Sequence, residues 1–286
     1  MALSLVLNIE EGSERSFAFG DGANDHSWES SRPFPAQVRD MATESVYEYG
    51  SRAGVHRVLR VLREAGVRCT TFSSAVALAV NPEATEQIIT DGHEICGHGW
   101  RWTEQWTLTR EQERQHILDA VDLLERVTGE RPTGWYSRYG PSVNTRELLM
   151  ETGFCYDSDA YNDDLPYGVE SVGPDPYVVV PYTMTYNDGR FGDRYASPDS
   201  FMSYLRRGLA LLLREGETSP RMMSIGMHPR IIGQAARADV LREFIEHAQG
   251  TGAVWFARRD EIAELWRSRP ATSTRPRKHA PRERHA

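Results

Sequence analysis

Short apolar runs of this sequence repeatedly end on side chains that can take up or release protons. The first run, residues 4–9, ends on two adjacent carboxylates, Glu10 and Glu11. Later runs are followed in the same way by polar and aromatic side chains: His98, Trp100, Trp102, Arg138, Asp159, Tyr182, Asn187, His228 and Arg230. Because catalytic residues of parallel β/α folds lie where strands end, we expect these groups to face one mouth.

Carboxylates, imidazoles and guanidinium groups together supply the functions that hydrolysis of an amide requires. Two close carboxylates repel each other, which raises one pKa, and that group can then act as a base near neutral pH. A histidine can return the proton to the leaving nitrogen, and an arginine can hold a developing oxyanion or a substrate carboxylate. We therefore predict an amide-bond hydrolase whose catalytic residues are Glu10, Glu11, His98 and His228.

The residues leave open whether this site holds a metal ion. Glu11, His98 and His228 could together supply three zinc ligands. However, no second histidine follows His98 within five residues, and Trp102 stands where such a partner would lie. An indole cannot ligate zinc. We expect no cofactor, with zinc or another divalent metal bound by Glu11 and His98 as the alternative.

Predicted strands and helices alternate along the chain, which is typical of βαβ units and a parallel sheet. Strands are expected over residues 4–9, 67–72, 94–96, 134–136, 154–156, 177–180, 222–227 and 253–256. Helices are expected over residues 46–65, 82–90, 109–128, 144–153, 198–214, 239–249 and 258–267. This pattern predicts an α/β fold, and the long loop over residues 12–45 is of the kind that often has a function.

Composition and charge argue against several classes of protein. With 40% hydrophobic and 26% charged residues, the chain has the composition of an ordinary globular enzyme. The net charge of −8 gives no reason to expect a nucleic-acid partner. The three cysteines do not resemble a disulfide framework and fit a cytoplasmic location. Residues 1–9 lack a basic n-region and are too short to span a bilayer, so we expect no membrane partner.

The last residues differ in composition from the rest. We expect a catalytic domain over residues 1–267 and a basic, disordered tail over residues 268–286, because the tail has no apolar run. The tail contains one acidic residue, Glu283, and the following basic residues: Arg269, Arg275, Arg277, Lys278, Arg282 and Arg284.

These residues resemble the polysaccharide deacetylase superfamily, and within it the cofactor-independent allantoinases and cyclic-imide hydrolases. The superfamily hallmark is a strand that ends in Asp-Asp-Gly, where the first Asp is the base and the second binds metal. Here the segment reads LNIEEG, which places Glu10 at the base position and Glu11 at the metal-ligand position. The second hallmark is a pair of histidines four residues apart. It reads GHGWRW here, so His98 matches and Trp102 replaces the second histidine.

Longer segments match the allantoinase-like branch in the same order: ESVYEYGSRAG (44–54), GWYS (134–137), YDSDAYNDDLPY (156–167), VPYTMTYNDGRF (180–191) and RMMSIGMHPRIIG (221–233). The last segment places His228 at the second catalytic histidine of the superfamily. The resemblance implies a distorted (β/α) barrel of the NodB-like type over about residues 3–267. It also implies a metal-independent hydrolase of a C–N bond in a small amide, ureide or cyclic imide.

In this hypothesis Glu10 is the general base, Glu11 raises its pKa or orients it, and His98 and His228 transfer protons. The remaining candidates bind a small-molecule substrate, with both arginines on its anionic groups: Trp100, Trp102, Arg138, Asp159, Tyr182, Asn187 and Arg230. The alternatives are a metal-dependent N-deacetylase of an N-acetyl sugar or other N-acyl substrate, and a non-catalytic binding protein on the same fold. We expect a homo-oligomer, for which the loop over residues 12–45 could form the interface.

Overall fold

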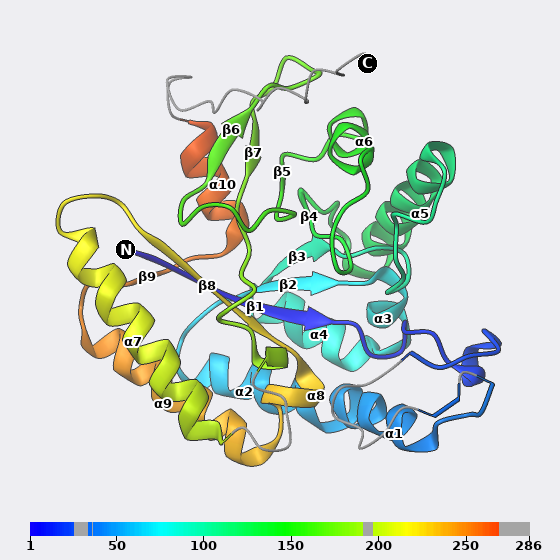
Figure 1. Ribbon diagram of the computed structural model, residues 1–286, viewed down its shortest axis with the longest axis horizontal. Coiled ribbons are helices and arrows are strands. Elements are labelled where there is room, and N and C mark those ends of the chain that lie inside the picture. Colours follow the sequence, from blue (N-terminus) through cyan, green and yellow to red (C-terminus); the bar gives the residue numbers. More distant parts are fainter. Residues whose placement is uncertain (26–33, 36, 191–196, 269–286) are drawn as a thin grey trace, which may run out of the picture.

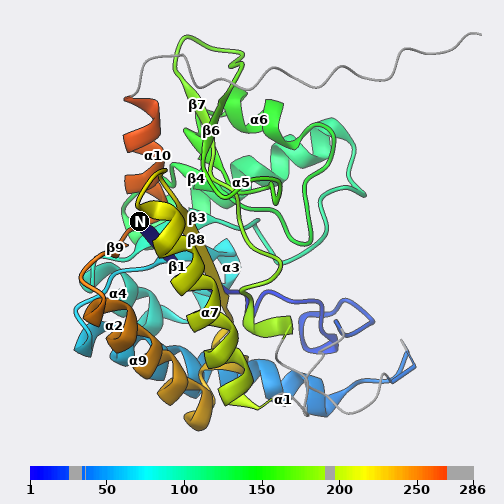
Figure 2. The same ribbon diagram turned by 60° about the vertical axis from the view of Figure 1, so that its left-hand side comes forward.

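A curled, mostly parallel sheet forms the centre of the computed structural model, which describes residues 1–25, 34–35, 37–190 and 197–268. Its strands follow the order β6-β7-β5-β4-β3-β2-β1-β8, and β9 pairs with the start of β1. Of the described strand pairs, only β6 and β7 run antiparallel. The helices lie outside this sheet (Figure 1, Figure 2), so the fold is the distorted (β/α) barrel that the sequence predicts.

The described strands have two to eight residues and the α-helices four to nineteen. The strands are β1 (Ala2–Ile9), β2 (Thr70–Ser73), β3 (Glu94–Gly97), β4 (Gly134–Trp135), β5 (Tyr156–Asp157), β6 (Tyr167–Val169), β7 (Tyr177–Val179), β8 (Met222–Met227) and β9 (Trp255–Phe256). The α-helices are α1 (Met41–Tyr49), α2 (Val55–Glu64), α3 (Ala75–Val80), α4 (Pro82–Thr90), α5 (Arg110–Thr128), α6 (Thr145–Glu151), α7 (Pro198–Gly216), α8 (Pro229–Ile232), α9 (Ala235–Gly250) and α10 (Arg259–Arg267). Two 3-10 turns, η1 (Phe17–Phe19) and η3 (Asp188–Arg190), and a π-helical turn, η2 (Gly50–Gly54), complete the set.

Each predicted strand is present, displaced by at most a few residues. The elements β6, α3 and α8 were not predicted, because each is too short to show a helical or strand period of its own. The helix predicted over residues 46–65 begins earlier, at Met41, and the π-helical turn η2 divides it into α1 and α2. The expected N-cap of α5 is confirmed, since the Thr109 side chain accepts a hydrogen bond from the backbone N–H of Gln112.

Strand β1 lies between β2 and the end strand β8, and the first two candidate residues follow directly at its end. It pairs in parallel with β2 on one side and β8 on the other. Neighbours on both edges and helices outside explain why its apolar residues are buried on both faces. The predicted apolar stripe of α2 is also buried: Val55, Val58, Leu59 and Leu62.

The barrel has a seam between the end strands of the sheet, β6 and β8, which do not pair within the described part of the chain. The segment that follows β7 runs beside β8 instead. There the N–H of Gly226 donates to the carbonyl of Tyr186 at 2.8 Å, and Asn187 forms an isolated parallel bridge with Gly226. One backbone contact of this kind leaves most of the seam without a sheet hydrogen-bond ladder.

A fully buried arginine from the start of α10 closes this seam. The Arg259 guanidinium donates to Ser158 Oγ at 2.8 Å and to Ser224 Oγ at 2.9 Å. It also donates to the carbonyl of Pro181 at 2.9 Å and to that of Val180. Ser224 belongs to β8, and the other acceptors directly follow β5 and β7, so one side chain joins segments on the two sides of the seam.

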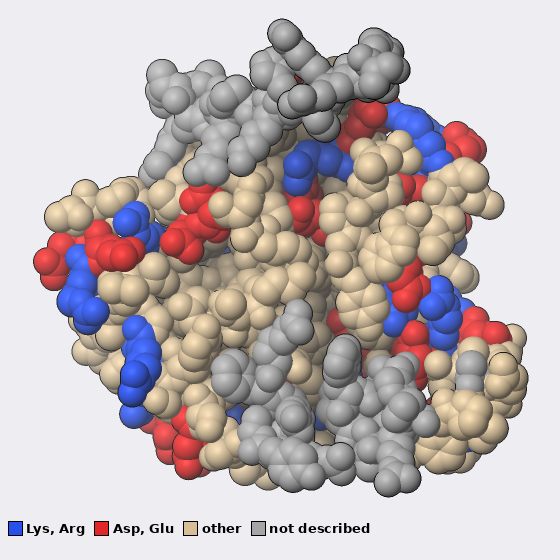
Figure 3. All heavy atoms as spheres, viewed as in Figure 1, with Lys and Arg blue, Asp and Glu red and all other residues tan. Residues whose placement is uncertain are grey.

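Charged side chains do not form a large single-sign patch on the face that Figure 3 shows, where Lys and Arg lie in separated groups beside Asp and Glu. Within the described residues, no helix combines the length and the apolar character needed to cross a membrane. The predicted tail lies outside the described residues, apart from Ser268.

Replacing Arg259 with Met should lower the free energy of unfolding by about 3 kcal/mol, because buried acceptors on both sides of the seam lose a charged donor. Urea denaturation monitored by circular dichroism measures this change. The matched control is Arg242→Met on the exposed face of α9, where the free energy of unfolding should not change. Equal stability of the Arg259 and Arg242 variants would show that the seam does not depend on this guanidinium.

Candidate active site

Glu10, His98 and His228 meet where β1, β3 and β8 end. Glu10 Oε1 lies 3.6 Å from His98 Nε2 and 3.5 Å from His228 Nε2. The Glu10 and His98 side chains are buried, and 12% of the His228 side chain is exposed. The ends of neighbouring parallel strands thus bring three of the four predicted catalytic residues around one carboxylate oxygen.

Glu11, the fourth predicted catalytic residue, points towards Arg230 at the start of α8. The Arg230 Nη1 atom donates to Glu10 Oε2 at 2.8 Å and lies 3.3 Å from Glu11 Oε1. The backbone N–H of Arg230 also donates to Glu11 Oε1, at 3.2 Å. A single guanidinium therefore bridges the two carboxylates, and its Nη1 is directed at them.

The surrounding charges separate the pKa values of the two glutamates. Burial alone raises the pKa of Glu10, but the positive charges of His228 and Arg230 outweigh this effect and hold it well below its usual value. Burial also raises the pKa of Glu11, and Arg230 offsets this only in part, so that its pKa is about 7. The two pKa values separate as predicted, but the raised one belongs to Glu11, not to Glu10.

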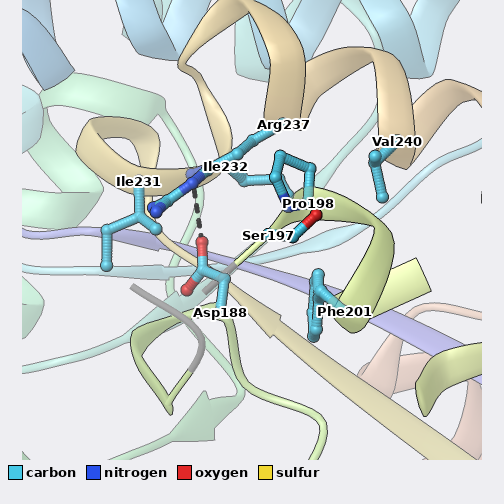
Figure 4. A pocket seen from close by; sticks show the side chains of 8 residues that line it. All are labelled: Asp188, Ser197, Pro198, Phe201, Ile231, Ile232, Arg237 and Val240. Atoms are coloured by element: carbon cyan, nitrogen blue, oxygen red, sulfur yellow. Dashed lines mark hydrogen bonds between the residues drawn. The ribbon is translucent and has the colours of Figure 1, made fainter. Parts of the chain in front are cut away.

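Asp188, in the turn η3, orients His228. Its Oδ1 atom lies 2.6 Å from His228 Nδ1, and its Oδ2 atom accepts the backbone N–H of His228 at 2.8 Å. Figure 4 shows the same carboxylate at the edge of a small hollow, hydrogen-bonded to the backbone N–H of Ile232. Burial lowers the pKa of His228, but Glu10 and Asp188 together raise it to about 10. His228 is therefore an imidazolium at neutral pH, with Nε2–H facing Glu10.

His98 differs from His228 in the group that it presents to Glu10. Its Nδ1 atom lies 2.7 Å from the backbone carbonyl of Tyr136, and a carbonyl can only accept, so Nδ1 carries the hydrogen. In the neutral ring, Nε2 then has a free lone pair, and it has no hydrogen-bond partner among the described residues. Glu10 is thus flanked by a donor, His228, and by an acceptor, His98.

Trp102 and Arg138 form a buried pair next to the glutamates. The Arg138 guanidinium stacks 3.7 Å from the centre of the Trp102 ring and donates to the Trp102 carbonyl at 2.6 Å. It also forms a two-pronged ion pair with Asp25, at 2.8 and 3.0 Å. Arg138, predicted to bind an anionic substrate group, already has a carboxylate partner within the protein. Trp100, on the same loop, is 41% exposed.

The last three predicted substrate residues, Asp159, Tyr182 and Asn187, make hydrogen bonds with one another or with other residues of the barrel. The Asp159 carboxylate accepts both the N–H and the hydroxyl of Ser137, each at 2.8 Å. Tyr182 is buried inside the barrel, where its hydroxyl accepts from Asn8 at 3.1 Å and lies 3.5 Å from Asn187 Nδ2. These contacts make the three residues parts of the wall that supports the site.

The residues around Glu10 do not fit a metal site. The predicted ligand pair separates, because Glu11 faces Arg230 while His98 faces Glu10. No three His, Cys, Asp or Glu side chains are arranged to hold a metal ion in the described part of the chain. Arg230 supplies positive charge between the two carboxylates, and the Trp102 ring, in place of a second histidine, packs against Arg138.

Sequence reasoning did not select Asp188, although it follows the predicted candidate Asn187 directly. Like Asn187, it follows the apolar run over residues 177–180, but its histidine partner is forty residues away and gives no local signal. Asp25 and Tyr47 were also missed. Both act on arginines of the site: Asp25 pairs with Arg138, and the Tyr47 ring lies 4.7 Å from the Arg230 guanidinium carbon.

Known proteins share this fold and much of this sequence. Residues 36–156 match the family model of polysaccharide deacetylases. A putative polysaccharide deacetylase of Schizosaccharomyces pombe is 33% identical over 93% of this chain and 90% of its own length. The crystal structure of a probable polysaccharide deacetylase from Pseudomonas aeruginosa PAO1 is 44% identical and covers 94% of this chain and 92% of its own, with a TM-score of 0.88. The chain belongs to the polysaccharide deacetylase family.

A second solved structure points to a particular part of this family. Puue allantoinase is 42% identical to the chain and has a TM-score of 0.88. The match covers 95% of this chain and 92% of the allantoinase. The resemblance to the allantoinase-like branch that the sequence indicates is therefore confirmed.

The raised pKa of Glu11 should make stability depend on pH. The folded chain keeps this proton up to about pH 7, whereas an ordinary glutamate, as in the unfolded chain, loses it near 4.5. Between these values the folded state binds more protons, so the free energy of unfolding falls as pH rises. The Glu11→Gln variant has no carboxyl group to bind this proton. Its free energy of unfolding relative to that of the wild type should therefore increase from pH 5 to pH 8.

Urea denaturation of both proteins across this range measures the difference. The exposed residue Glu83 on α4 provides the control, because Glu83→Gln should change stability equally at both pH values. A Glu11→Gln difference that stays constant with pH would contradict the raised pKa.

Proposed function

We propose that the protein hydrolyses a C–N bond of a small amide, ureide or cyclic imide by acid–base catalysis that needs no metal ion. The observation that carries this proposal is the position of Glu10 Oε1, between the Nε2 atoms of His98 and His228 at 3.6 and 3.5 Å. The family of C–N hydrolases named above, and the similarity to an allantoinase in particular, support the same class of reaction.

In this mechanism Glu10 is the general base. The neighbouring cations keep its carboxylate ionised at neutral pH, and Arg230 holds Oε2, which leaves Oε1 to accept a proton from water. The Nε2 lone pair of His98 can accept the second hydrogen of that water. As the proton moves to Glu10, the water oxygen forms a bond with the carbonyl carbon of the substrate.

His228 is the general acid. Its Nε2–H donates a proton to the leaving nitrogen as the C–N bond breaks, and Asp188 stabilises the imidazolium before this step. The proton that Glu10 gained can then pass to His228, which lies 3.5 Å away. The cycle consumes one water and returns both residues to their starting charges.

An uncharged substrate suits this site best. Arg230 is bound to the two glutamates and Arg138 to Asp25, so each arginine near the site already has an anionic partner. The half-exposed Trp100 offers an apolar wall on the loop after His98, whereas the Trp102 ring is buried against Arg138. A small planar ring with neutral amide groups would match this wall, and a carboxylate would have to compete with the internal ion pairs.

The test is a screen of uncharged cyclic ureides, cyclic imides and linear N-acyl compounds, before and after exhaustive treatment with EDTA. We expect turnover of at least one cyclic compound that chelation leaves unchanged. In the Glu10→Gln variant kcat should fall by about 10²–10⁴, the usual contribution of a general base. The exposed Glu83→Gln variant should keep wild-type kcat.

Two results would contradict the proposal. If EDTA abolishes turnover and zinc restores it, or if the enzyme releases acetate from N-acetylglucosamine oligomers only with added metal, the metal-dependent N-deacetylase is correct. Unchanged turnover in Glu10→Gln would remove this residue from the mechanism.

A further inference from the structure

The helical segment over residues 41–64 packs against α8, the short helix that carries Arg230. It consists of α1, the π-helical turn η2 and α2, which lie beside α8 in Figure 1. Three of its residues, Tyr47, Gly50 and Gly54, are spaced three and four apart and therefore share one face. This face belongs to the segment 44–54, and the proposed mechanism gives it no role.

Tyr47 supports the Arg230 guanidinium from one side. The ring is buried, and its centre lies 4.7 Å from the guanidinium carbon. The Trp102 ring lies on the same group at 5.6 Å, and the two ring centres are 6.2 Å apart. Two rings thus limit the movement of Arg230, and a desolvated cation–π contact adds to its ion pairs.

Gly50 gives space to the Glu11 carboxylate. A Cβ atom at this position would lie 2.6 Å from Glu11 Oε1 and 2.8 Å from Glu11 Cγ. Any side chain would therefore push Glu11 away from the helix. The displaced oxygen is the one that accepts the backbone N–H of Arg230 at 3.2 Å.

Gly54 allows the helix backbone to touch the backbone of α8. A Cβ atom there would lie 2.1 Å from the carbonyl oxygen of Pro229, the residue before Arg230. Gly233, at the other end of α8, also lies against Gly54, because a Cβ atom at position 233 would lie 2.5 Å from Gly54 Cα.

The far end of α8 is also tied to this helical segment. The carbonyl of Gly233 accepts from the Tyr49 hydroxyl at 3.2 Å and from Arg57. The segment thus holds α8 near both of its ends. A π-helical turn is unusual in itself and is frequent at functional sites.

We propose that Tyr47, Gly50 and Gly54 are positioning residues that fix Arg230 between Glu10 and Glu11. They act through the arginine and the carboxylates, without contact to the reacting atoms. The catalytic consequence rests on the proposed function, because only then does a displaced Arg230 misplace the general base. The geometric part can be tested without any substrate.

The test compares variants of this face with a matched glycine elsewhere. In a crystal structure of Gly50→Ala we expect the contact between Glu11 Oε1 and the Arg230 N–H to be lost. We expect kcat to fall by about tenfold or more with KM nearly unchanged, because misplacement by about 1 Å can cost 10²-fold in rate. Gly250→Ala, in α9 with no atom near its Cβ position, should keep the wild-type structure and kcat.

Tyr47 gives a second comparison that does not change the helix backbone. Tyr47→Phe keeps the ring and should keep kcat, whereas Tyr47→Leu removes the cation–π contact and should lower it, with both variants folded by circular dichroism. Gly54→Ala is expected to disturb folding because of its backbone contact, so the decision rests on the Gly50 and Tyr47 variants.

The proposal is overturned if Gly50→Ala keeps the Glu11–Arg230 contact in the crystal, or if it has the same kcat as Gly250→Ala. Equal loss of kcat in Tyr47→Phe and Tyr47→Leu would also overturn the part assigned to the ring. If the wild type hydrolyses no compound of the screen, the proposed function fails, and the crystal structure of Gly50→Ala still decides the positioning role.

Discussion

The bridge from Arg230 to Glu10 and Glu11 is the interaction on which the site depends. Two adjacent carboxylates, both buried, would repel each other strongly and could not both stay ionised without a cation. Parallel pairing of β1 with β8 places the glutamates, which follow β1, beside Arg230 in the first turn of α8. The guanidinium then neutralises part of the charge of the two carboxylates. It holds Oε2 of Glu10 and leaves Oε1 directed at the two histidines. Such a buried pair is sensitive to the loss of either partner.

Around this bridge the two histidines differ in the hydrogen-bond partners of their Nδ1 atoms. The carboxylate of Asp188 at Nδ1 stabilises the charged ring of His228. The neutral carbonyl of Tyr136 at Nδ1 of His98 leaves Nε2 as an acceptor. One carboxylate oxygen therefore faces a proton donor and a proton acceptor at almost equal distances. An acid–base hydrolase requires this asymmetry, and here it follows from the Asp188 carboxylate and the Tyr136 carbonyl, which bind the Nδ1 atoms of the two histidines.

The sequence predicted the ends of the strands well and the pairing of side chains poorly. Glu10, His98 and His228 were identified because an apolar run that stops at a polar residue is a local signal. The partners Asp188 and Asp25 were not, because their histidine and arginine lie far away in the chain and only the fold brings them together. For the same reason Arg138 was assigned to a substrate anion, although it binds Asp25. The pKa order of the two glutamates depends on His228 and Arg230, which no local pattern could place.

The proposed mechanism depends on the protonation of His228 and Glu10, with Arg230 as the local cation, and neutron diffraction from deuterated crystals at neutral pH locates these protons. The proposed mechanism predicts deuterium on both ring nitrogens of His228 and none on the Glu10 carboxylate. It also predicts that Nη1 of Arg230 directs its deuterium atoms at Glu10 and Glu11. A neutral His228 beside a protonated Glu10, or a metal ion bound by Glu10 and His98, would contradict it.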